Sequence, residues 1–173
     1  MIRVSDYIVQ QLVHEGILHV FMVTGRGTLF LTDSVAANNE IAGISLHHEQ
    51  SAAFAAVAYS QYTGNPSACM VSTGCAGTNT LTGVLNAWQD GNPCVFISGQ
   101  NKLNETSHYT GIPVRTYGQQ ETDLIPILDS ITKKVNRIFR RQLSGITLNG
   151  QAIIGINFST IFFIFLFIYL ILL

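Results

Sequence analysis

The residues best suited to chemistry in this chain lie between two apolar segments. Glu49 follows the apolar run 41–46 and precedes the segment 51–62, in which small apolar residues predominate. A buried strand followed by a buried helix predicts packed flanks and little water around the carboxylate. The helix N-terminus favours the anion, whereas loss of water favours the neutral acid, so this group is suited to share a proton with a ligand nitrogen.

Two simpler interpretations of this region compete with that one. A glutamate in a first helical turn is commonly a surface charge that complements the helix dipole, and the local pattern alone leaves this interpretation open. His47 and His48 suggest a metal site, but neighbours in a strand point to opposite faces. No cysteine or further carboxylate completes a ligand set there, so we expect no metal site in this chain.

Alternating strands and helices must position Glu49. We expect strands over 19–23, 41–46, 68–72 and 94–98, and helices over 6–15, 28–37, 49–62 and 78–89. This alternation predicts an α/β fold, a parallel sheet with helices on both faces, and a core that includes Ile44, Ala55, Val71 and Phe96. Ligands bind beyond the carboxyl ends of such strands, where the turns 24–27, 48–49, 72–79 and 99–100 should meet.

Composition narrows the classes of function. The chain has 173 residues, a formal net charge of −1 and only 11% charged residues, so we expect no nucleic-acid partner. The three cysteines, Cys69, Cys75 and Cys94, have no metal-binding spacing. With no signal peptide at the N-terminus, they are interpreted as reduced residues of a cytoplasmic protein.

Short motifs follow one another in a fixed order through residues 3–136. They are GILHVF at 16–21, TGRG at 24–27, HEQSAA at 48–53, STGCAGTN at 72–79, ISGQ at 97–100 and QETD at 120–123. This series resembles the N-terminal, pyrimidine-binding domain of thiamine diphosphate enzymes of the acetolactate synthase and 2-oxoacid decarboxylase superfamily. The chain departs from the usual acetolactate synthase pattern at 23–26, Cys75 and Gln119, which leaves the product open.

The resemblance implies roles for individual residues. Glu49 would be catalytic, because the family glutamate hydrogen-bonds the ring nitrogen of the cofactor's aminopyrimidine and so helps to activate the thiazolium carbon that attacks a 2-oxoacid. Gln120 and Gln100 would lie near the substrate. The residues expected to contact thiamine diphosphate, besides Glu49, are Thr24, Gly25, Ser72, Gly74, Thr78 and Asn79.

The resemblance also implies that part of the active site is missing. Family members bind the cofactor's magnesium-linked diphosphate through Gly-Asp-Gly and a later Asn, and this motif does not occur here. We therefore expect half a site, completed in a homodimer or by a complementary diphosphate-domain chain, and no flavin. The chain would be an enzyme component, a thiamine diphosphate-dependent lyase or synthase that is inactive alone. The alternative is a non-catalytic, truncated remnant.

The composition changes after residue 136. A basic cluster occupies 137–141, and 152–173 is nearly all apolar, with a length in the window of about 17–25 residues that spans a bilayer. We predict a pyrimidine-binding domain over 1–136, a basic linker over 137–151 and an apolar C-terminal helix over 152–173 that stays apart from the core. A transmembrane anchor that keeps the domain cytoplasmic and a truncation or frameshift product both remain open.

Overall fold

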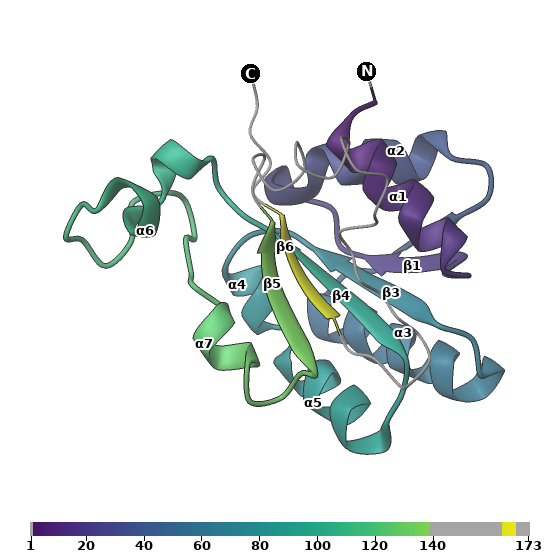
Figure 1. The fold of residues 1–173 in the computed structure, drawn as a ribbon. Coiled ribbons are helices and arrows are strands. Elements are labelled where there is room, and N and C mark those ends of the chain that lie inside the picture. The colour runs from purple at the N-terminus through teal and green to yellow at the C-terminus, as the bar shows by residue number, and fades with distance from the viewer. Residues whose placement is uncertain (1, 139–163, 169–173) are drawn as a thin grey trace.

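A six-stranded sheet lies between two layers of helices in the computed structural model, which describes residues 2–138 and 164–168 (Figure 1). All neighbouring strands are parallel, in the order β2-β1-β3-β4-β6-β5. The predicted parallel α/β fold is therefore confirmed. The strands are β1 His19–Met22, β2 Ala42–Ser45, β3 Ser67–Val71, β4 Cys94–Gly99, β5 Lys134–Ile138 and β6 Ile164–Ile168.

Two pairs of helices cover the two faces of this sheet. α1 (Val4–His14) and α2 (Leu29–Ala37) pack on one face, and α3 (Glu49–Thr63) and α5 (Leu81–Asp90) pack on the other. The sequence predicted all four within a few residues. The shorter helical turns are η1 Arg26–Thr28, α4 Cys75–Thr78, η2 Leu103–Glu105, α6 Ser107–Thr110 and α7 Ile125–Leu128.

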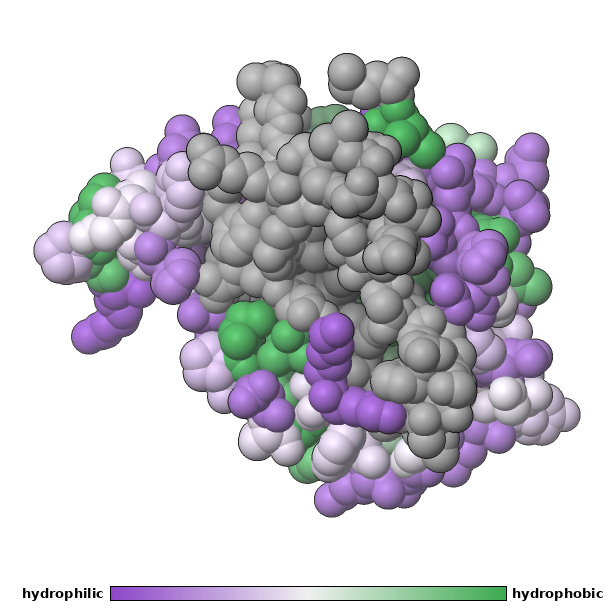
Figure 2. Space-filling model, viewed as in Figure 1, coloured by the Kyte–Doolittle hydropathy of each residue, from purple (hydrophilic) through white to green (hydrophobic). Residues whose placement is uncertain are grey.

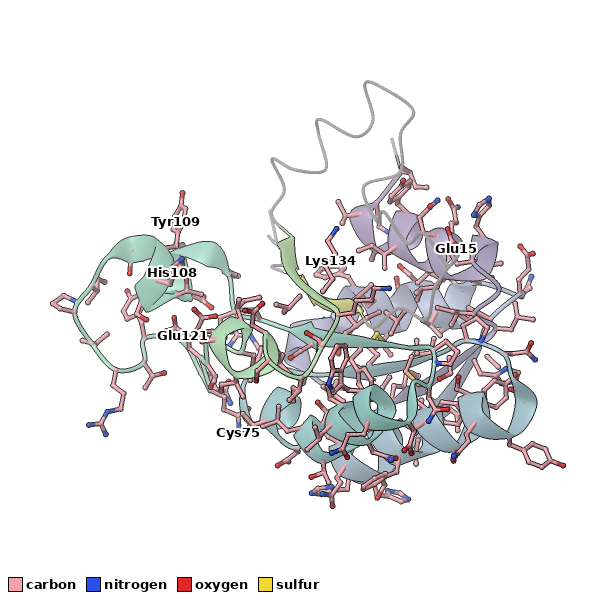
Figure 3. All side chains as sticks on the ribbon, turned by 60° about the horizontal axis from the view of Figure 1, so that its bottom comes forward. Glu15, Cys75, His108, Tyr109, Glu121 and Lys134 are labelled. Atoms are coloured by element: carbon pink, nitrogen blue, oxygen red, sulfur yellow. The ribbon has the colours of Figure 1, made fainter. Side chains whose placement is uncertain are left out.

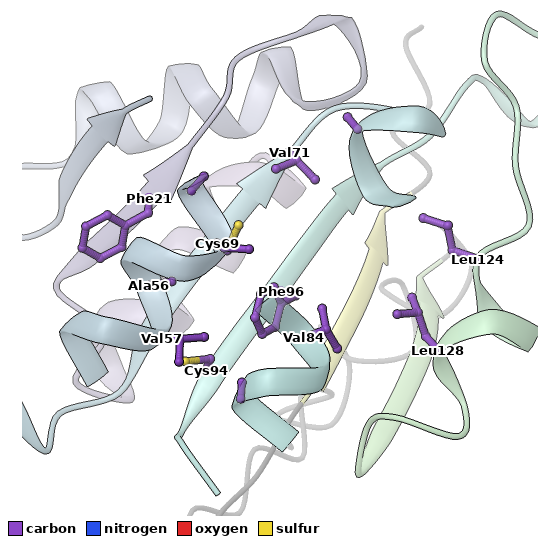
Figure 4. Packing of buried hydrophobic residues seen from close by; sticks show 14 residues of the cluster. Phe21, Ala56, Val57, Cys69, Val71, Val84, Cys94, Phe96, Leu124 and Leu128 are labelled. Atoms are coloured by element: carbon purple, nitrogen blue, oxygen red, sulfur yellow. The ribbon is translucent and has the colours of Figure 1, made fainter. Parts of the chain in front are cut away.

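Alternate residues of the central strands pack into two separate halves of the core, one on each face of the sheet. Val20, Met70 and Ile97 point toward α1 and α2, whereas Phe21 and Phe96 point toward α3 and α5. Successive strand side chains face opposite sides of a sheet, so strands buried on both faces must be apolar throughout. Figure 4 shows the second half, in which the strands meet Ala56 and Val57 of α3 and Val84 of α5. Val71 and Phe96 are core residues, as predicted.

The strand before Glu49 is less buried than its sequence predicts. Among the described strands, β2 pairs only with β1, and all four residues of β2 are exposed, so the expectation that Ile44 belongs to the core is wrong. Ala55 is only partly buried, beside the second half of the core. An apolar run does not distinguish a central strand from an edge strand, because strand order depends on pairing with distant segments.

The C-terminal segment also differs from the prediction. Its five described residues, Ile164–Ile168, form β6 between β4 and β5, so an apolar helix over this part of 152–173 is wrong. The remainder of the predicted helix lies outside the described residues. Ile-Phe-Leu-Phe-Ile consists mostly of β-branched and aromatic residues, which favour strands, and it pairs on both sides within the sheet. Among the residues that the structure describes, no helix is long and apolar enough to cross a membrane.

An arm that contains α6 projects from the body of the domain after β4. Its exposed residues include Tyr109, Ile112, Val114 and Tyr117. In Figure 2 the arm carries hydrophobic atoms among polar ones. The sequence did not predict α6. The helix has only four residues before its C-cap Gly111, which is too short for a helical periodicity to appear in the sequence.

Candidate functional site

Glu49 lies at the edge where the parallel strands end. It is the first residue of α3, and it follows the carboxyl end of β2. The loop after β3 reaches it there, because Nδ2 of Asn79 donates a hydrogen bond of 2.9 Å to Oε2 of Glu49. The predicted meeting of Glu49 with the loop 72–79 is therefore confirmed. This edge is where open parallel sheets bind ligands.

The turn that carries Glu49 is fixed by neighbouring contacts. His48 caps α3, and its Nδ1 accepts a hydrogen bond of 3.2 Å from the backbone N–H of Gln50. Nε2 of Gln50 in turn donates to Oγ1 of Thr82, at the start of α5, across 3.1 Å. These bonds join the first turn of α3 to the beginning of α5. His48 thus has a structural role that the sequence did not predict.

A close contact between α3 and α5 sets the distance between these elements. A Cβ atom on Gly83 would lie 2.5 Å from the Cβ of Ala53, so the two helices approach as closely as side chains allow. Both residues are buried. Because packed interiors deform little, this contact gives the Glu49 turn a rigid support.

The Glu49 carboxylate has one oxygen left for a ligand. The side chain is partly buried, and Asn79 engages Oε2. Within the described residues, no hydrogen bond reaches Oε1. A carboxylate oxygen in this position can accept a hydrogen bond from a protonated ring nitrogen. The acceptor that Glu49 offers therefore fits the ring nitrogen of the aminopyrimidine of thiamine diphosphate.

Ser72 joins the loop after β1 to the end of β4. Its Oγ accepts a hydrogen bond of 3.2 Å from the backbone N–H of Gly27, and its carbonyl accepts one of 3.0 Å from Oγ of Ser98. Gly25 lies against the Ser72 side chain, where a Cβ would collide. Ser72 and Gly25 therefore fix the loops to each other, and Thr24 beside them is exposed.

Gly74 and Gln120 meet at the base of the arm. Gly74 has a φ of +52°, and a Cβ there would overlap the carbonyl oxygen of Gln120. Gln120 itself has a φ of +56°, in the left-handed region that costs a non-glycine residue about 1–2 kcal/mol. Such strain persists only where surrounding contacts impose it, and it is frequent at functional sites. The exposed Gln120 side chain stays a candidate for substrate contact.

Gln100 has a different environment from Gln120. It is only 5% exposed, and its amide donates a hydrogen bond of 3.0 Å to the carbonyl of Thr122. The next residue, Asn101, donates from Nδ2 to the carbonyl of Gln119 across 2.9 Å. The side chains of Gln100 and Asn101 thus fix the backbone of the segment 119–122 through two hydrogen bonds. No motif in the sequence indicated Asn101, since its partner is 18 residues away.

Thr78 lies in the same loop as Asn79. Its side chain is partly buried, and its hydroxyl donates to the carbonyl of Cys75 across 3.0 Å. This bond supports the short helix α4, which ends directly before Asn79. A role for Thr78 toward a cofactor stays a prediction.

Glu121, labelled in Figure 3, joins separate segments of the arm to one another. Its Oε1 accepts hydrogen bonds from the backbone N–H and the hydroxyl of Ser107, and its Oε2 accepts from the backbone N–H groups of Tyr117 and Gly118. Burial alone would raise the pKa of Glu121, but these donors together lower the pKa below its usual value. The sequence contains Glu121 in its last motif but did not indicate this role.

A metal site was one interpretation of the two histidines that precede Glu49. His47 and His48 are both exposed, and the described part of the chain contains no group of three or more His, Cys, Asp or Glu side chains that could hold a metal ion.

Known proteins that are similar in sequence to this chain include a family of cofactor-binding enzymes. Residues 2–127 match the family described as thiamine pyrophosphate enzyme, N-terminal TPP binding domain. The chain is 32% identical over 132 residues to acetolactate synthase 2, chloroplastic, of Nicotiana tabacum, a match that covers 75% of this chain and 18% of that protein. It is 36% identical over 100 residues to the acetolactate synthase large subunit of Haemophilus influenzae, covering 58% and 18% of the two chains.

The fold places this chain among open parallel α/β domains, the class of protein that binds ligands at the carboxyl edge of its strands. Within that class, the chain belongs to the thiamine pyrophosphate enzyme family and contains its N-terminal TPP binding domain. The matched segment spans less than one fifth of the length of the acetolactate synthases named above.

Proposed function

We propose that this chain supplies the pyrimidine-binding side of a thiamine diphosphate site in an acetolactate synthase-like enzyme that acts on 2-oxoacids. The observation that carries the proposal is the position of Glu49, whose Oε2 accepts a hydrogen bond from Asn79 and whose Oε1 accepts none from the described part of the chain. The family match over 2–127 favours an enzyme component over a non-catalytic remnant.

The candidate residues other than Gln100 have defined parts in this proposal. Glu49 holds a proton between its carboxylate and the pyrimidine ring nitrogen, the general acid–base role of a carboxylate. Thr24, Gly25, Ser72, Gly74, Thr78 and Asn79 shape the pocket around it. The strained Gln120 presents its amide toward the substrate. When bound, thiamine diphosphate supplies the carbanion chemistry that attacks a 2-oxoacid.

A complementary diphosphate domain from a second kind of protein chain completes the site in this proposal, whether or not the described domain also forms a homodimer. It would hold the diphosphate and the magnesium ion, since the sequence contains no Gly-Asp-Gly motif. The described chain alone should therefore bind thiamine diphosphate weakly and turn over no 2-oxoacid.

The test replaces Glu49 by glutamine in the full chain, supplemented with a diphosphate-domain chain of a related acetolactate synthase. The amide has the same shape as the carboxylate but cannot take up the proton, so exchange of the thiazolium proton should fall by about 100-fold or more. Glu40→Gln is the matched control, because Glu40 is an exposed carboxylate in the loop before β2. Equal exchange in wild type and Glu49→Gln would remove Glu49 from the mechanism.

A further inference from the structure

Asn79 contacts the one carboxylate to which we assign proton transfer. The two residues are 30 positions apart and follow different strands, yet Nδ2 of Asn79 lies 2.9 Å from Oε2 of Glu49. We infer that Asn79 is a positioning residue, which holds the Glu49 carboxylate so that Oε1 faces the pyrimidine of the cofactor. This inference rests on the proposed function, and it gives Asn79 a task that does not require contact with the cofactor.

The backbone of Asn79 is itself held in place. It follows α4 directly, has helical angles of φ −65° and ψ −18°, and donates its N–H to the carbonyl of Cys75 across 3.0 Å. Its side chain is exposed toward the same edge as Glu49. The amide group is therefore presented from a fixed backbone, as a residue that orients another one requires.

The partner helix is fixed with respect to this loop. The Gln50 to Thr82 bond lies beside the Glu49 to Asn79 bond, and the close contact of Ala53 with Gly83 follows one helical turn further on. Two polar contacts and one buried contact thus connect the start of α3 with the segment 79–83. These contacts keep the backbone at Asn79 close to the first turn of α3.

An amide is chemically suited to such a role. The Nδ2 group donates without carrying charge, so it occupies one oxygen and leaves the carboxylate charge in place. A glutamate with both oxygens unengaged samples several rotamers and loses that freedom when a ligand binds. With Asn79 in place, part of this ordering precedes binding, and the affinity for the ligand rises.

The test is a double-mutant cycle on the full chain, with thiamine diphosphate as the probe. Affinities are measured by NMR titration for wild type, Asn79→Ala, Glu49→Gln and the double variant, and a ¹⁵N-labelled pyrimidine reports on its ring nitrogen. Asn86→Ala is the matched control, because Asn86 also donates an amide hydrogen bond to a carboxylate, that of Asp90, across 2.7 Å on α5. Thermal unfolding of every variant checks that the fold is kept.

We expect Asn79→Ala to weaken binding about fivefold, as the loss of one such hydrogen bond does, and to shift the ring-nitrogen resonance. In the Glu49→Gln background the same change should alter affinity by less than about twofold, because Asn79 acts through the carboxylate. Asn86→Ala should bind as wild type does.

Three results would overturn the inference, and they are distinguishable. Losses of affinity that add in the double variant would show that Asn79 binds the ligand directly. Unchanged binding in Asn79→Ala, with a loss in Glu49→Gln, would remove the positioning role and leave the proposed function standing. No response of wild type to thiamine diphosphate would overturn both.

Discussion

The carbonyl oxygen of Gln120 occupies the place where any side chain at position 74 would begin. Gly74 belongs to the loop after β3, and Gln120 lies at the base of the arm after β4, so this contact joins two loops of the candidate site. It explains why Gln120 adopts its left-handed backbone, because neighbours on both sides hold it against the glycine.

Gly74→Ala should therefore separate these loops. We expect a loss of about 3 kcal/mol or more in the free energy of unfolding, since a buried clash adds to the cost of a positive φ. Gly64→Ala is the control, because Gly64 also has a positive φ but has open space around its Cβ position. It should cost only about 1–2 kcal/mol. Urea denaturation measures both, and equal losses would show that the Gln120 contact contributes nothing.

The arm should loosen in acid. The folded pKa of Glu121 lies below its ordinary value of 4.5, so its hydrogen bonds stabilise the folded arm fully above that pH. This contribution is lost as the pH falls from about 4.5 through the lower folded pKa. The protection of the Ser107, Tyr117 and Gly118 amides against hydrogen exchange, measured relative to the intrinsic exchange rate at each pH, should fall over that range.

The variant Glu121→Gln distinguishes the effect of protonating Glu121 from the effects of other groups that titrate in acid. Relative to the intrinsic exchange rate, the variant should show low protection of the arm amides already at neutral pH and little further loss of protection in acid, whereas Glu40→Gln should behave as wild type does. If the arm amides of Glu121→Gln kept the wild-type dependence on pH, another group would control the arm.

The cysteines should differ sharply in reactivity. Cys75 is exposed, whereas Cys69 and Cys94 are buried. Burial raises the pKa of Cys94 to about 11 and that of Cys69 well above its usual range, and the thiolate is the reactive form. A disulfide reagent should modify only Cys75 in the folded chain and all three thiols after unfolding. In Cys75→Ser, rapid modification of the folded chain would contradict this burial.

β6 offers a test of the C-terminal segment. Residue 166 pairs with Ile97 of β4 and with residue 136 of β5, so Leu166→Pro removes a backbone donor in the middle of the sheet. We expect a loss of about 3 kcal/mol in the free energy of unfolding, against less than about 1.5 kcal/mol for Leu166→Ile. Equal stability of the two variants would place this segment outside the sheet.

The sequence by itself determined the alternation of strands and helices, the parallel sheet and the position of Glu49 at a strand end. These follow from short-range pattern, because short apolar runs and helical runs are local, and parallel strands place all their carboxyl ends at one edge. The ordered motifs from GILHVF to QETD identified the family, which the match over 2–127 confirms.

The tertiary structure alone decided which of these residues touch. The pairing of Asn79 with Glu49 and the fit of Gly74 to Gln120 join segments that are 30 and 46 residues apart, and no local pattern encodes the separation of two loops. The exposure of Ile44 goes with the position of β2 at the edge of the described sheet, where β1 is its one neighbour among the described strands. An apolar segment satisfies its backbone hydrogen bonds equally well as a helix or as a paired strand, so pairing with β4 and β5, and not hydrophobicity, makes 164–168 a strand.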